Sequence, residues 1–211
     1  TGLNFDATDA FIVEPNAGND SICYWIKDSL VYQMDTLQLK MDYLYTDSLN
    51  QLVPKTDTIY LANKLTRAQK EKLAKKEAEE KEKERKKKER KGEKVGPEPT
   101  PFLNMKVDAP STFDINKNIV LSFEEPVVRM DTSAIHVNVK VDTLWVKTPF
   151  LLVADSVVPR QYEILASWEP KKEYKLQIDS AAILGLYGLH TNKVEQTLKV
   201  KKQDEYGTLL L

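Results

Sequence analysis

The sequence predicts a mainly β protein, with antiparallel β-sandwiches on both sides of one long, charged, solvent-exposed α-helix. Two observations lead to this prediction. Apolar and polar residues alternate before residue 64 and after residue 101, which is typical of strands with one buried face. Residues 64–94, in contrast, consist almost wholly of Lys, Arg, Glu and Ala, and after Leu73 they offer a core nothing larger than alanine. The helix therefore divides two β-rich bodies.

Residues 1–63 are predicted to form the first β domain. Alternating apolar residues predict strands in the stretches 22–26, 37–45 and 58–61. Residues that favour turns cluster at 15–20, 47–50 and 54–56. About four strands are too few for a full sandwich. We therefore expect this body to be completed either by strands upstream of Thr1 or by the second half of the chain.

Residues 64–101 are predicted to form the charged helix and a proline-rich linker. The residue types of the run are strong helix formers, and neither Gly nor Pro interrupts it before Gly92. Thr66 and Gln69 fit a capping box at its start, and prolines from Pro97 onward exclude helix after its end. Glutamates and lysines four residues apart can stabilise such a helix in water, while an apolar seam for a coiled coil is missing.

The helix is also the basic part of the chain. Residues 64–94 contain 15 basic and 8 acidic residues, whereas the rest contains 16 basic and 24 acidic residues. The densest basic patch consists of Arg85, Lys86, Lys87, Lys88, Arg90 and Lys91. We expect either a plain solvated spacer or a basic arm that contacts an acidic partner, anionic lipid or polyanionic glycan. Nucleic acid is not expected as a partner, because interleaved glutamates cancel much of the field and aromatic side chains for stacking are absent.

Residues 102–203 are predicted to form the second β-sandwich, because short alternating stretches recur at spacings of roughly 8–12 residues. The expected strands are 103–107, 119–123, 135–141, 144–146, 150–153, 162–168, 174–178 and 197–200. Turns are expected at 170–172 and 185–188. Residues 204–211 are expected to begin a further strand or domain.

Two motifs of the second body resemble the bacterial Ig-like modules of surface proteins. Residues 120–127, Val-Leu-Ser-Phe-Glu-Glu-Pro-Val, resemble that family's strand with a Phe-Ser-Glu-Pro type ending. Residues 168–178, Trp-Glu-Pro-Lys-Lys-Glu-Tyr-Lys-Leu-Gln-Ile, resemble its turn into a Tyr-x-Leu-x-Ile strand. Gly188 stands at the glycine of a following turn, although Gly185 replaces that turn's aspartate. The chain thus resembles the middle segment of an Ig-like domain-containing lipoprotein of Bacteroidetes.

This resemblance covers residues 104–202 well and residues 1–63 loosely, and the charged helix lies outside the family pattern. It implies tandem Ig-like sandwiches in an outer-membrane or cell-surface protein, lipid-anchored through a cysteine upstream of Thr1. The partners it implies are other outer-membrane or surface proteins, and the membrane is reached only through that anchor. We expect a non-catalytic scaffold or protein-interaction module. The alternatives are a glycan-binding or adhesion module and, with less support, a hydrolase accessory domain.

The residues give little support for catalysis, and neither a cofactor nor a metal site is expected. His136 and His190 are the only histidines, and their spacing does not match a zinc motif. Neither a nucleophile elbow nor a phosphate-binding glycine loop is present. Cys23 is the single cysteine and is expected to be a buried structural thiol. Glu124 and Glu125 are expected to be solvated acids of a turn.

Three tryptophans are the candidates for contact with a sugar. Core or interdomain packing is expected for Trp25, Trp145 and Trp168. Trp145 lies between Leu144 and Val146 on a predicted strand, so it is expected to point opposite to them and to be the most exposed of the three.

Overall fold

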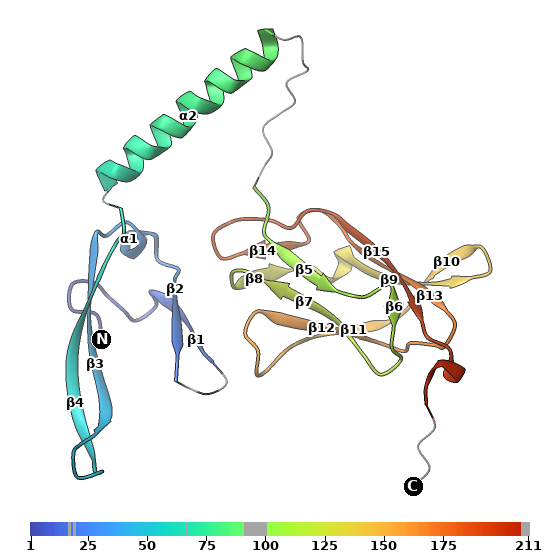
Figure 1. Cartoon of the computed structure of the whole chain (residues 1–211), viewed down its shortest axis with the longest axis horizontal. Helices are drawn as coiled ribbons and strands as arrows, with labels where there is room; N and C mark the ends of the chain where they lie inside the picture. Colours follow the sequence, from blue (N-terminus) through green and yellow to red (C-terminus); the bar gives the residue numbers. More distant parts are fainter. Residues whose placement is uncertain (17, 19, 66, 91–100, 208–211) are drawn as a thin grey trace. The chain divides into compact units, whose positions relative to one another are not determined.

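The computed structural model describes residues 1–16, 18, 20–65, 67–90 and 101–207. It contains 46% strand and 15% helix, which confirms a mainly β chain with several antiparallel sheets. The described residues divide into two compact units (Figure 1). The first contains residues 1–13, 24–65 and 67–90, and the second contains residues 14–16, 18, 20–23 and 101–207.

The first unit begins with part of a two-stranded sheet and one turn of helix. Strand β1 (Phe11–Pro15) pairs with β2 (Ile22–Ile26), and helix α1 (Ser29–Tyr32) follows. The Asp28 side chain caps α1 by accepting a hydrogen bond from the Leu30 N–H at 2.8 Å. The buried apolar cluster of this unit contains Ala10, Val31 and Leu37. Since these side chains are few and small, apolar burial stabilises the described part of this unit only weakly.

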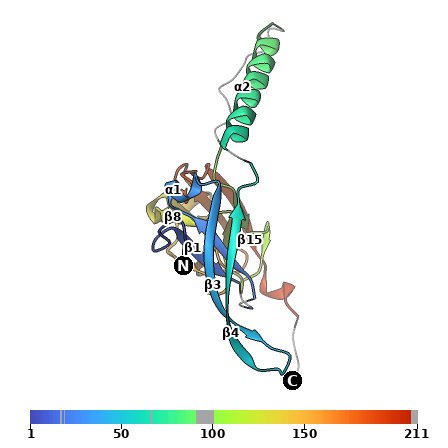
Figure 2. The ribbon, with the colours of Figure 1, turned by 90° about the vertical axis from the view of Figure 1, so that its left-hand side faces the viewer.

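The longest ladder of the first unit joins β3 (Thr36–Thr46) to β4 (Leu52–Ala62), antiparallel along their whole length (Figure 2). The turn predicted at residues 54–56 is wrong, because β4 runs through Pro54, which lies opposite Leu44. A proline is tolerated at an open strand edge, and β4 has no second partner among the described strands. Within residues 1–63 the described strands thus form two two-stranded sheets, and an Ig-like domain there stays a prediction.

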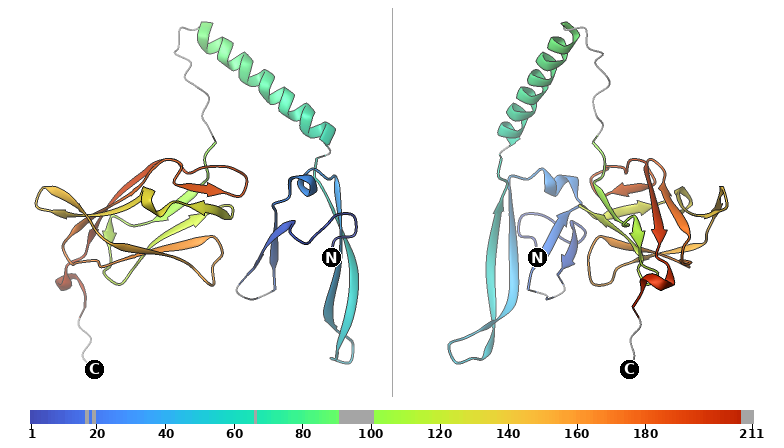
Figure 3. Two further views of the ribbon diagram at one scale, coloured as in Figure 1. Left: turned by 180° about the vertical axis from the view of Figure 1, so that it is seen from behind. Right: turned by 45° about the vertical axis from the view of Figure 1, so that its right-hand side comes forward.

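Helix α2 (Arg67–Arg90) is a single helix of 24 residues, and Figure 3 shows it from two sides as an uninterrupted coil. Its described side chains are exposed except for Lys70, which is half-buried. The Lys70 Nζ lies 5.3 Å from the ring centroid of Tyr32, so the first turn contacts its own unit. Thr66 of the predicted capping box and Gly92, the first glycine after the predicted helix, lie outside the described residues.

The second unit contains a five-stranded sheet in the order β10-β9-β13-β15-β6. In that order the strands are Leu144–Lys147, Ile135–Val141, Glu173–Ile178, Val194–Val200 and Thr112–Phe113. Neighbours are antiparallel except for β15 and β6, which pair in parallel. This last pairing joins strands near the two ends of the described second half of the chain.

A four-stranded antiparallel sheet has the order β11-β12-β7-β5. In that order its strands are Phe150–Ala154, Gln161–Ala166, Ile119–Phe123 and Met105–Asp108. A further antiparallel pair consists of β14 (Ile183–Gly185) and β8 (Val127–Met130). Two short 3₁₀ helices, η1 (Thr132–Ala134) and η2 (Gln203–Glu205), complete the elements, and residues 208–211 of the predicted further strand lie outside the described residues.

One apolar core lies between the two larger sheets of the second unit. It contains alternate residues of strands from both sheets: Ile119, Leu121 and Phe123 of β7, Ile164 of β12, Ile135 and Val137 of β9, Tyr174, Leu176 and Ile178 of β13, and Leu198 and Val200 of β15. Because one cluster draws on both sheets, the sheets pack face to face, as in a β-sandwich. Each such side chain contributes about 1.5–3 kcal/mol when fully buried.

Three aromatic rings pack against one another within this core. The Trp168 ring centroid lies 5.1 Å from that of Phe113 and 4.9 Å from that of Tyr174, both in edge-to-face geometry. The Tyr174 hydroxyl accepts a hydrogen bond from the Glu169 N–H at 2.8 Å and donates one to the Ser167 carbonyl at 3.1 Å. The loop before β13 is therefore fixed to the core by one side chain.

The bend between β7 and β8 buries a carboxylate. Glu124 is exposed as predicted, but Glu125 is 7% exposed, so the prediction of a solvated acid is wrong for Glu125. The Tyr187 N–H donates a hydrogen bond to Glu125 Oε1 at 3.3 Å. Gly185 makes room for this carboxylate, because a Cβ there would lie 1.9 Å from Oε1. Gly188, in the predicted turn, has a φ of 82°, which favours glycine.

Candidate functional site

Helix α2 carries most of the predicted basic patch. Lys86 and Lys87 are exposed, and Lys86 Nζ lies 2.7 Å from Glu82 Oε1, one turn earlier. The remaining patch residues are not described at the level of side chains: Arg85, Lys88 and Arg90, which belong to α2, and Lys91, which lies outside the described residues altogether. At least one lysine of the patch is thus paired within the helix.

Positive charge increases toward the C-terminal end of α2. Residues 67–80 contain 5 basic and 4 acidic residues, whereas residues 81–90 contain 7 basic and 3 acidic residues. Basic side chains are favoured at this end because they interact with the negative end of the helix dipole. Since Leu73 is the only apolar side chain larger than alanine among the described side chains of α2, this helix is better suited to recognise a partner by charge than by apolar packing.

Trp145 lies on the outer face of the five-stranded sheet, opposite Lys140 in the β10–β9 ladder. It is half-buried, whereas its strand neighbours Leu144 and Val146 are 71% and 47% exposed. Two lysines cover its ring: Lys175 Nζ lies 4.7 Å and Lys140 Nζ 5.9 Å from the ring centroid. A flat ligand would therefore have to displace two amines to reach this ring.

The two lysines above Trp145 are themselves paired with carboxylates. Lys140 Nζ lies 2.7 Å from Glu173 Oε2, and Lys175 Nζ lies 3.0 Å from Glu195 Oε1. The hydrogen bond from Lys140 lowers the pKa of Glu173, and the hydrogen bond from Lys175 lowers the pKa of Glu195. Both carboxylates remain ionised at neutral pH, so this face carries balanced ion pairs and is not suited to proton donation.

A second aromatic cluster, which the sequence reasoning missed, lies on the β3–β4 ribbon. Tyr43 and Tyr45 are two residues apart on β3, hence on one face, and are 36% and 50% exposed. Lys55 lies opposite Tyr43, and its Nζ lies 5.7 Å and 5.4 Å from the ring centroids of Tyr43 and Tyr45. Asp57 accepts a hydrogen bond from the Tyr43 hydroxyl at 2.6 Å and lies 3.1 Å from Lys55 Nζ.

These contacts favour the charged forms of Lys55 and Asp57. Hydrogen bonding with the Tyr43 side chain, and then with Asp57, raises the pKa of Lys55. Hydrogen bonds from Tyr43 and then Lys55 lower the pKa of Asp57. The Tyr-x-Tyr spacing was the available sequence signal. The contact of Lys55 with both rings depends on the register of β3 and β4, which cannot be read from the sequence.

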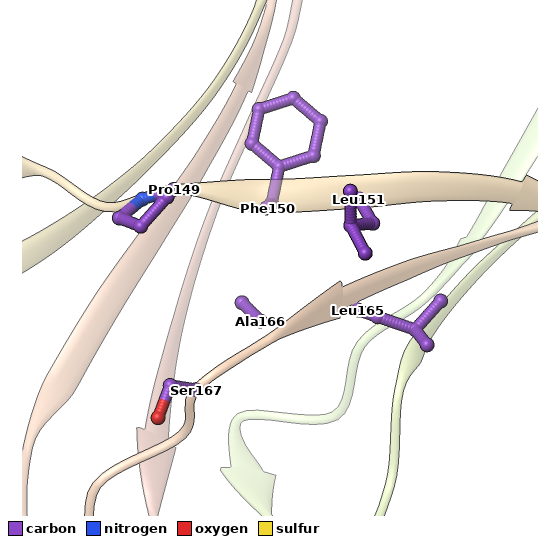
Figure 4. A pocket seen from close by; sticks show the side chains of 6 residues that line it. All are labelled: Pro149, Phe150, Leu151, Leu165, Ala166 and Ser167. Atoms are coloured by element: carbon purple, nitrogen blue, oxygen red, sulfur yellow. The ribbon is translucent and has the colours of Figure 1, made fainter.

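A shallow apolar depression lies beside strands β11 and β12 (Figure 4). Its volume is about 330 Å³, and it is lined by Pro149, Phe150, Leu151, Leu165, Ala166 and Ser167. Ser167 is the only one of these six residues with a polar side chain. With no titratable group in its lining, the depression suits an apolar side chain of a partner better than a chemical reaction.

A second depression, of about 610 Å³, lies in the first unit, and its carboxylates are already engaged. Asp6 accepts hydrogen bonds from the N–H and hydroxyl of Thr8, which lower its pKa. Asp9 pairs with Lys27, and Asp28 caps helix α1. These carboxylates therefore serve the local structure.

The remaining reactive side chains do not form a catalytic arrangement in the described part of the chain. His136 Nε2 lies 3.5 Å from Asp179 Oδ2 on the surface. Among residues that the structure describes, no group of three or more His, Cys, Asp or Glu side chains could hold a metal ion. Cys23 is exposed, so the prediction of a buried thiol is wrong. Its neighbours Ile22 and Tyr24 are also exposed, because β2 belongs to a two-stranded sheet that covers little surface.

No protein-family model matches this chain, and no curated protein matches its sequence. Within the described residues, no helix combines the length and the apolar character needed to cross a membrane.

Proposed function

We propose that this chain is a non-catalytic scaffold or protein-interaction module, built from Ig-like β-sandwiches and carried by a bacterial surface lipoprotein. The strand order of the second unit supports the Ig-like assignment. Ig-like sandwiches place strands A, B, E and D in one sheet and strands C, F and G in the other, to which the variable type adds C′ beside C. The order β5-β7-β12-β11 corresponds to A-B-E-D, and β15-β13-β9-β10 corresponds to G-F-C-C′.

The observation that most strongly supports this assignment is the hydroxyl bridge of Tyr174. Ig-like sandwiches carry a tyrosine near the start of strand F whose hydroxyl bonds to the backbone a few residues upstream. Tyr174 is the second residue of β13, and its hydroxyl bonds to the backbone of Glu169 and Ser167. For residues 1–63 the Ig-like assignment rests on apolar alternation and on the family resemblance. The proposed outer-membrane or cell-surface location, with a lipid anchor upstream, rests on the resemblance.

Helix α2 is proposed to make the partner contact. Its basic excess lies at the C-terminal end, and its described side chains are almost all in solvent. Such a rod attracts an acidic surface over a distance set by ionic strength, about 8 Å at physiological salt. The proposed partner is therefore an outer-membrane or surface protein with an acidic face.

The direction of the pKa shifts supports a non-catalytic role. Each resolved shift of a carboxylate lowers its pKa, as for Asp57, Asp114 and Glu173. Hydrolases that use paired carboxylates need the opposite for one of the two, a raised pKa on the proton donor.

The test is a pull-down from gently solubilised outer membranes of the source cells, with bound proteins identified by mass spectrometry. Two triple charge reversals are compared with the unaltered chain. Both preserve helix propensity, and each breaks at least one ion pair among the described residues of α2. The test variant is Lys86→Glu, Lys87→Glu and Lys88→Glu, and the matched control is Lys72→Glu, Lys75→Glu and Lys76→Glu. We expect a defined set of surface proteins that the test variant loses and the control retains. If the unaltered chain recovered no defined set of proteins, or if both variants lost these proteins equally, the proposed role of the basic end would be wrong.

Glycan binding is a second candidate function, favoured by the exposed pair Tyr43 and Tyr45. Adjacent rings on one strand face form a platform for a sugar ring, and Lys55 and Asp57 supply hydrogen-bonding groups beside it. The test is a glycan array probed with the whole chain, with Tyr45→Ala as the test variant. Tyr60→Ala is the control, because Tyr60 is 66% exposed but lies on the other face of the ribbon. No binding to any glycan, or equal loss with both variants, would exclude this platform.

A further inference from the structure

Strand β11 is an unprotected edge of the four-stranded sheet. It lies at the end of the order β11-β12-β7-β5, so β12 is its only partner among the described strands. Its five residues, Phe-Leu-Leu-Val-Ala, include neither a charge nor a proline, and Leu151 and Val153 are 68% and 48% exposed. The opposite edge strand, β5, carries Lys106 and Asp108. Natural edge strands are normally blunted by charges, prolines or bulges, and β11 has none of these features.

The ladder with β12 fixes which backbone groups of β11 point to the free edge. The Asp155 N–H donates to the Gln161 carbonyl at 2.9 Å, which continues the register of the β11–β12 pairing. In an antiparallel ladder, opposed residues alternate between hydrogen-bonded and non-bonded pairs. The backbone groups of Leu151 and Val153 therefore face β12, like those of Asp155. Those of Phe150, Leu152 and Ala154 face outward, away from the sheet.

We infer that β11 pairs antiparallel with β11 of a second copy of this chain, about a two-fold axis at Leu152. In this register Leu152 lies opposite its own counterpart, and Phe150 lies opposite Ala154 of the other copy. All three outward-facing residues then exchange both of their backbone hydrogen bonds across the axis. The two four-stranded sheets become one continuous sheet. This inference is independent of the partner proposed for α2.

The chemistry of the strand favours a second copy over an unrelated partner. Because β11 is uncharged, pairing with itself places no like charges opposite each other. The two-fold register also places exposed Leu151 opposite exposed Val153 of the other copy, twice, so each apolar side chain gains an apolar neighbour. Leu151 lines the 330 Å³ depression (Figure 4). The inferred register therefore brings Val153 of the other copy next to a residue of this depression. The nearest charge in the neighbouring strand, Glu163, lies behind Val153 and away from the axis.

A strand pair of this length buries less than a standard interface, so the dimer is expected to be reversible and concentration-dependent. The first test is sedimentation equilibrium of the 211-residue chain from about 10 μM to about 500 μM. We expect a monomer–dimer equilibrium that Val153→Lys weakens at least about tenfold, because the two-fold axis introduces two charges into the apolar contact. Val128→Lys is the matched control, since Val128 is 58% exposed on β8, and it is expected to dimerise like the unaltered chain. A chain that stays monomeric throughout, or two variants that dimerise equally, would overturn the inference.

A disulfide test examines the register itself, in a Cys23→Ser background. Leu151 and Val153 of opposite copies form a non-hydrogen-bonded pair in the inferred register, with Cα atoms about 4.5 Å apart, which a disulfide can span. Mild oxidation of a mixture of Leu151→Cys and Val153→Cys chains should give cross-linked heterodimers. Each variant alone places its two cysteines on a diagonal and should cross-link several-fold less. Equal yields from the mixture and from the separate variants would refute this register.

Discussion

Replacing Tyr174 by phenylalanine tests the most specific contact in the second unit. The substitution keeps the ring, which lies 4.9 Å from Trp168, and removes only the hydroxyl. The Glu169 N–H loses its acceptor, which costs about 1–3 kcal/mol for a buried donor, and the bond to the Ser167 carbonyl adds about 1 kcal/mol. Because both groups are only partly buried, we expect a loss of about 2–3 kcal/mol in the free energy of unfolding. At roughly 4–8 °C for each kcal/mol, the melting temperature of this unit should fall by roughly 10–20 °C.

The measurement is urea denaturation of the whole chain followed by near-ultraviolet circular dichroism, with hydrogen exchange to localise the loss to residues 101–207. Tyr60→Phe is the control, because that side chain is 66% exposed on the first unit and should change stability by less than about 0.5 kcal/mol. If Tyr174→Phe cost no more than the control, the hydroxyl bridge would not stabilise the loop before β13, and the reasoning would be wrong.

Three further predictions concern the same chain. Gly185→Ala should destabilise the second unit by about 1–3 kcal/mol, because its Cβ would lie 1.9 Å from Glu125 Oε1, and adding Glu125→Ala should recover part of the loss in thermal denaturation. The hydrogen bond from Lys201 lowers the pKa of Asp114 below its ordinary 3.8, and the same bond raises the pKa of Lys201 above 10.5. The ion pair should therefore stabilise the fold between pH 3.8 and pH 10.5, and its contribution should be lost as the pH falls below 3.8 or rises above 10.5. If Asp114→Asn left the dependence of stability on pH unchanged, this prediction would be wrong. Replacing residues 68–91 by a short Gly-Ser linker should leave the β-sheet circular dichroism signal and cooperative melting intact. A loss of stability as large as that of a core mutation would instead show that α2 packs against the folded units.

Apolar periodicity was sufficient to predict the main strands of the second unit. The stretches 119–123 and 135–141 were predicted with the bounds that β7 and β9 have. The period was readable because one face of each strand enters the core while the other meets solvent. Strands β6 and β14 were missed, since two or three residues are too few to show a period, and β8 was missed because its sequence, Val-Val-Arg-Met, does not alternate.

Contacts between distant segments could not be read from the sequence. Glu125 looked like a solvated acid because its neighbours form a turn, and its burial depends on the space left by Gly185, 60 residues later. Pro54 looked like a turn residue, and only the register of β3 and β4 shows that it lies within a ladder at an open edge. Cys23 lay in an apolar alternation, but the sheet that contains it has too few strands to bury it.

The candidate sites also differ in whether they could be predicted from the sequence. The basic run on α2 is a local property, so composition alone identified it. The environment of Trp145 is not local, because Lys140 and Lys175 reach its ring from two other strands. The cluster around Tyr43 likewise requires Lys55 from the partner strand. Contacts between side chains of different strands are therefore the part of a site that cannot be predicted from a single sequence.

The parallel pairing of β6 with β15 determines how the second unit responds to mechanical tension. A force applied at the start of β6 and at the end of β15 slides these two parallel strands past each other. Two backbone hydrogen bonds, from Lys199 N–H to Ser111 O at 2.8 Å and from Lys201 N–H to Phe113 O at 2.9 Å, then share the force and must break together. The ion pair of Lys201 with Asp114, at 2.7 Å, lies at the same place. Strands β6 and β15 thus form a shear clamp that resists stretching between them more than a hairpin opened one bond at a time.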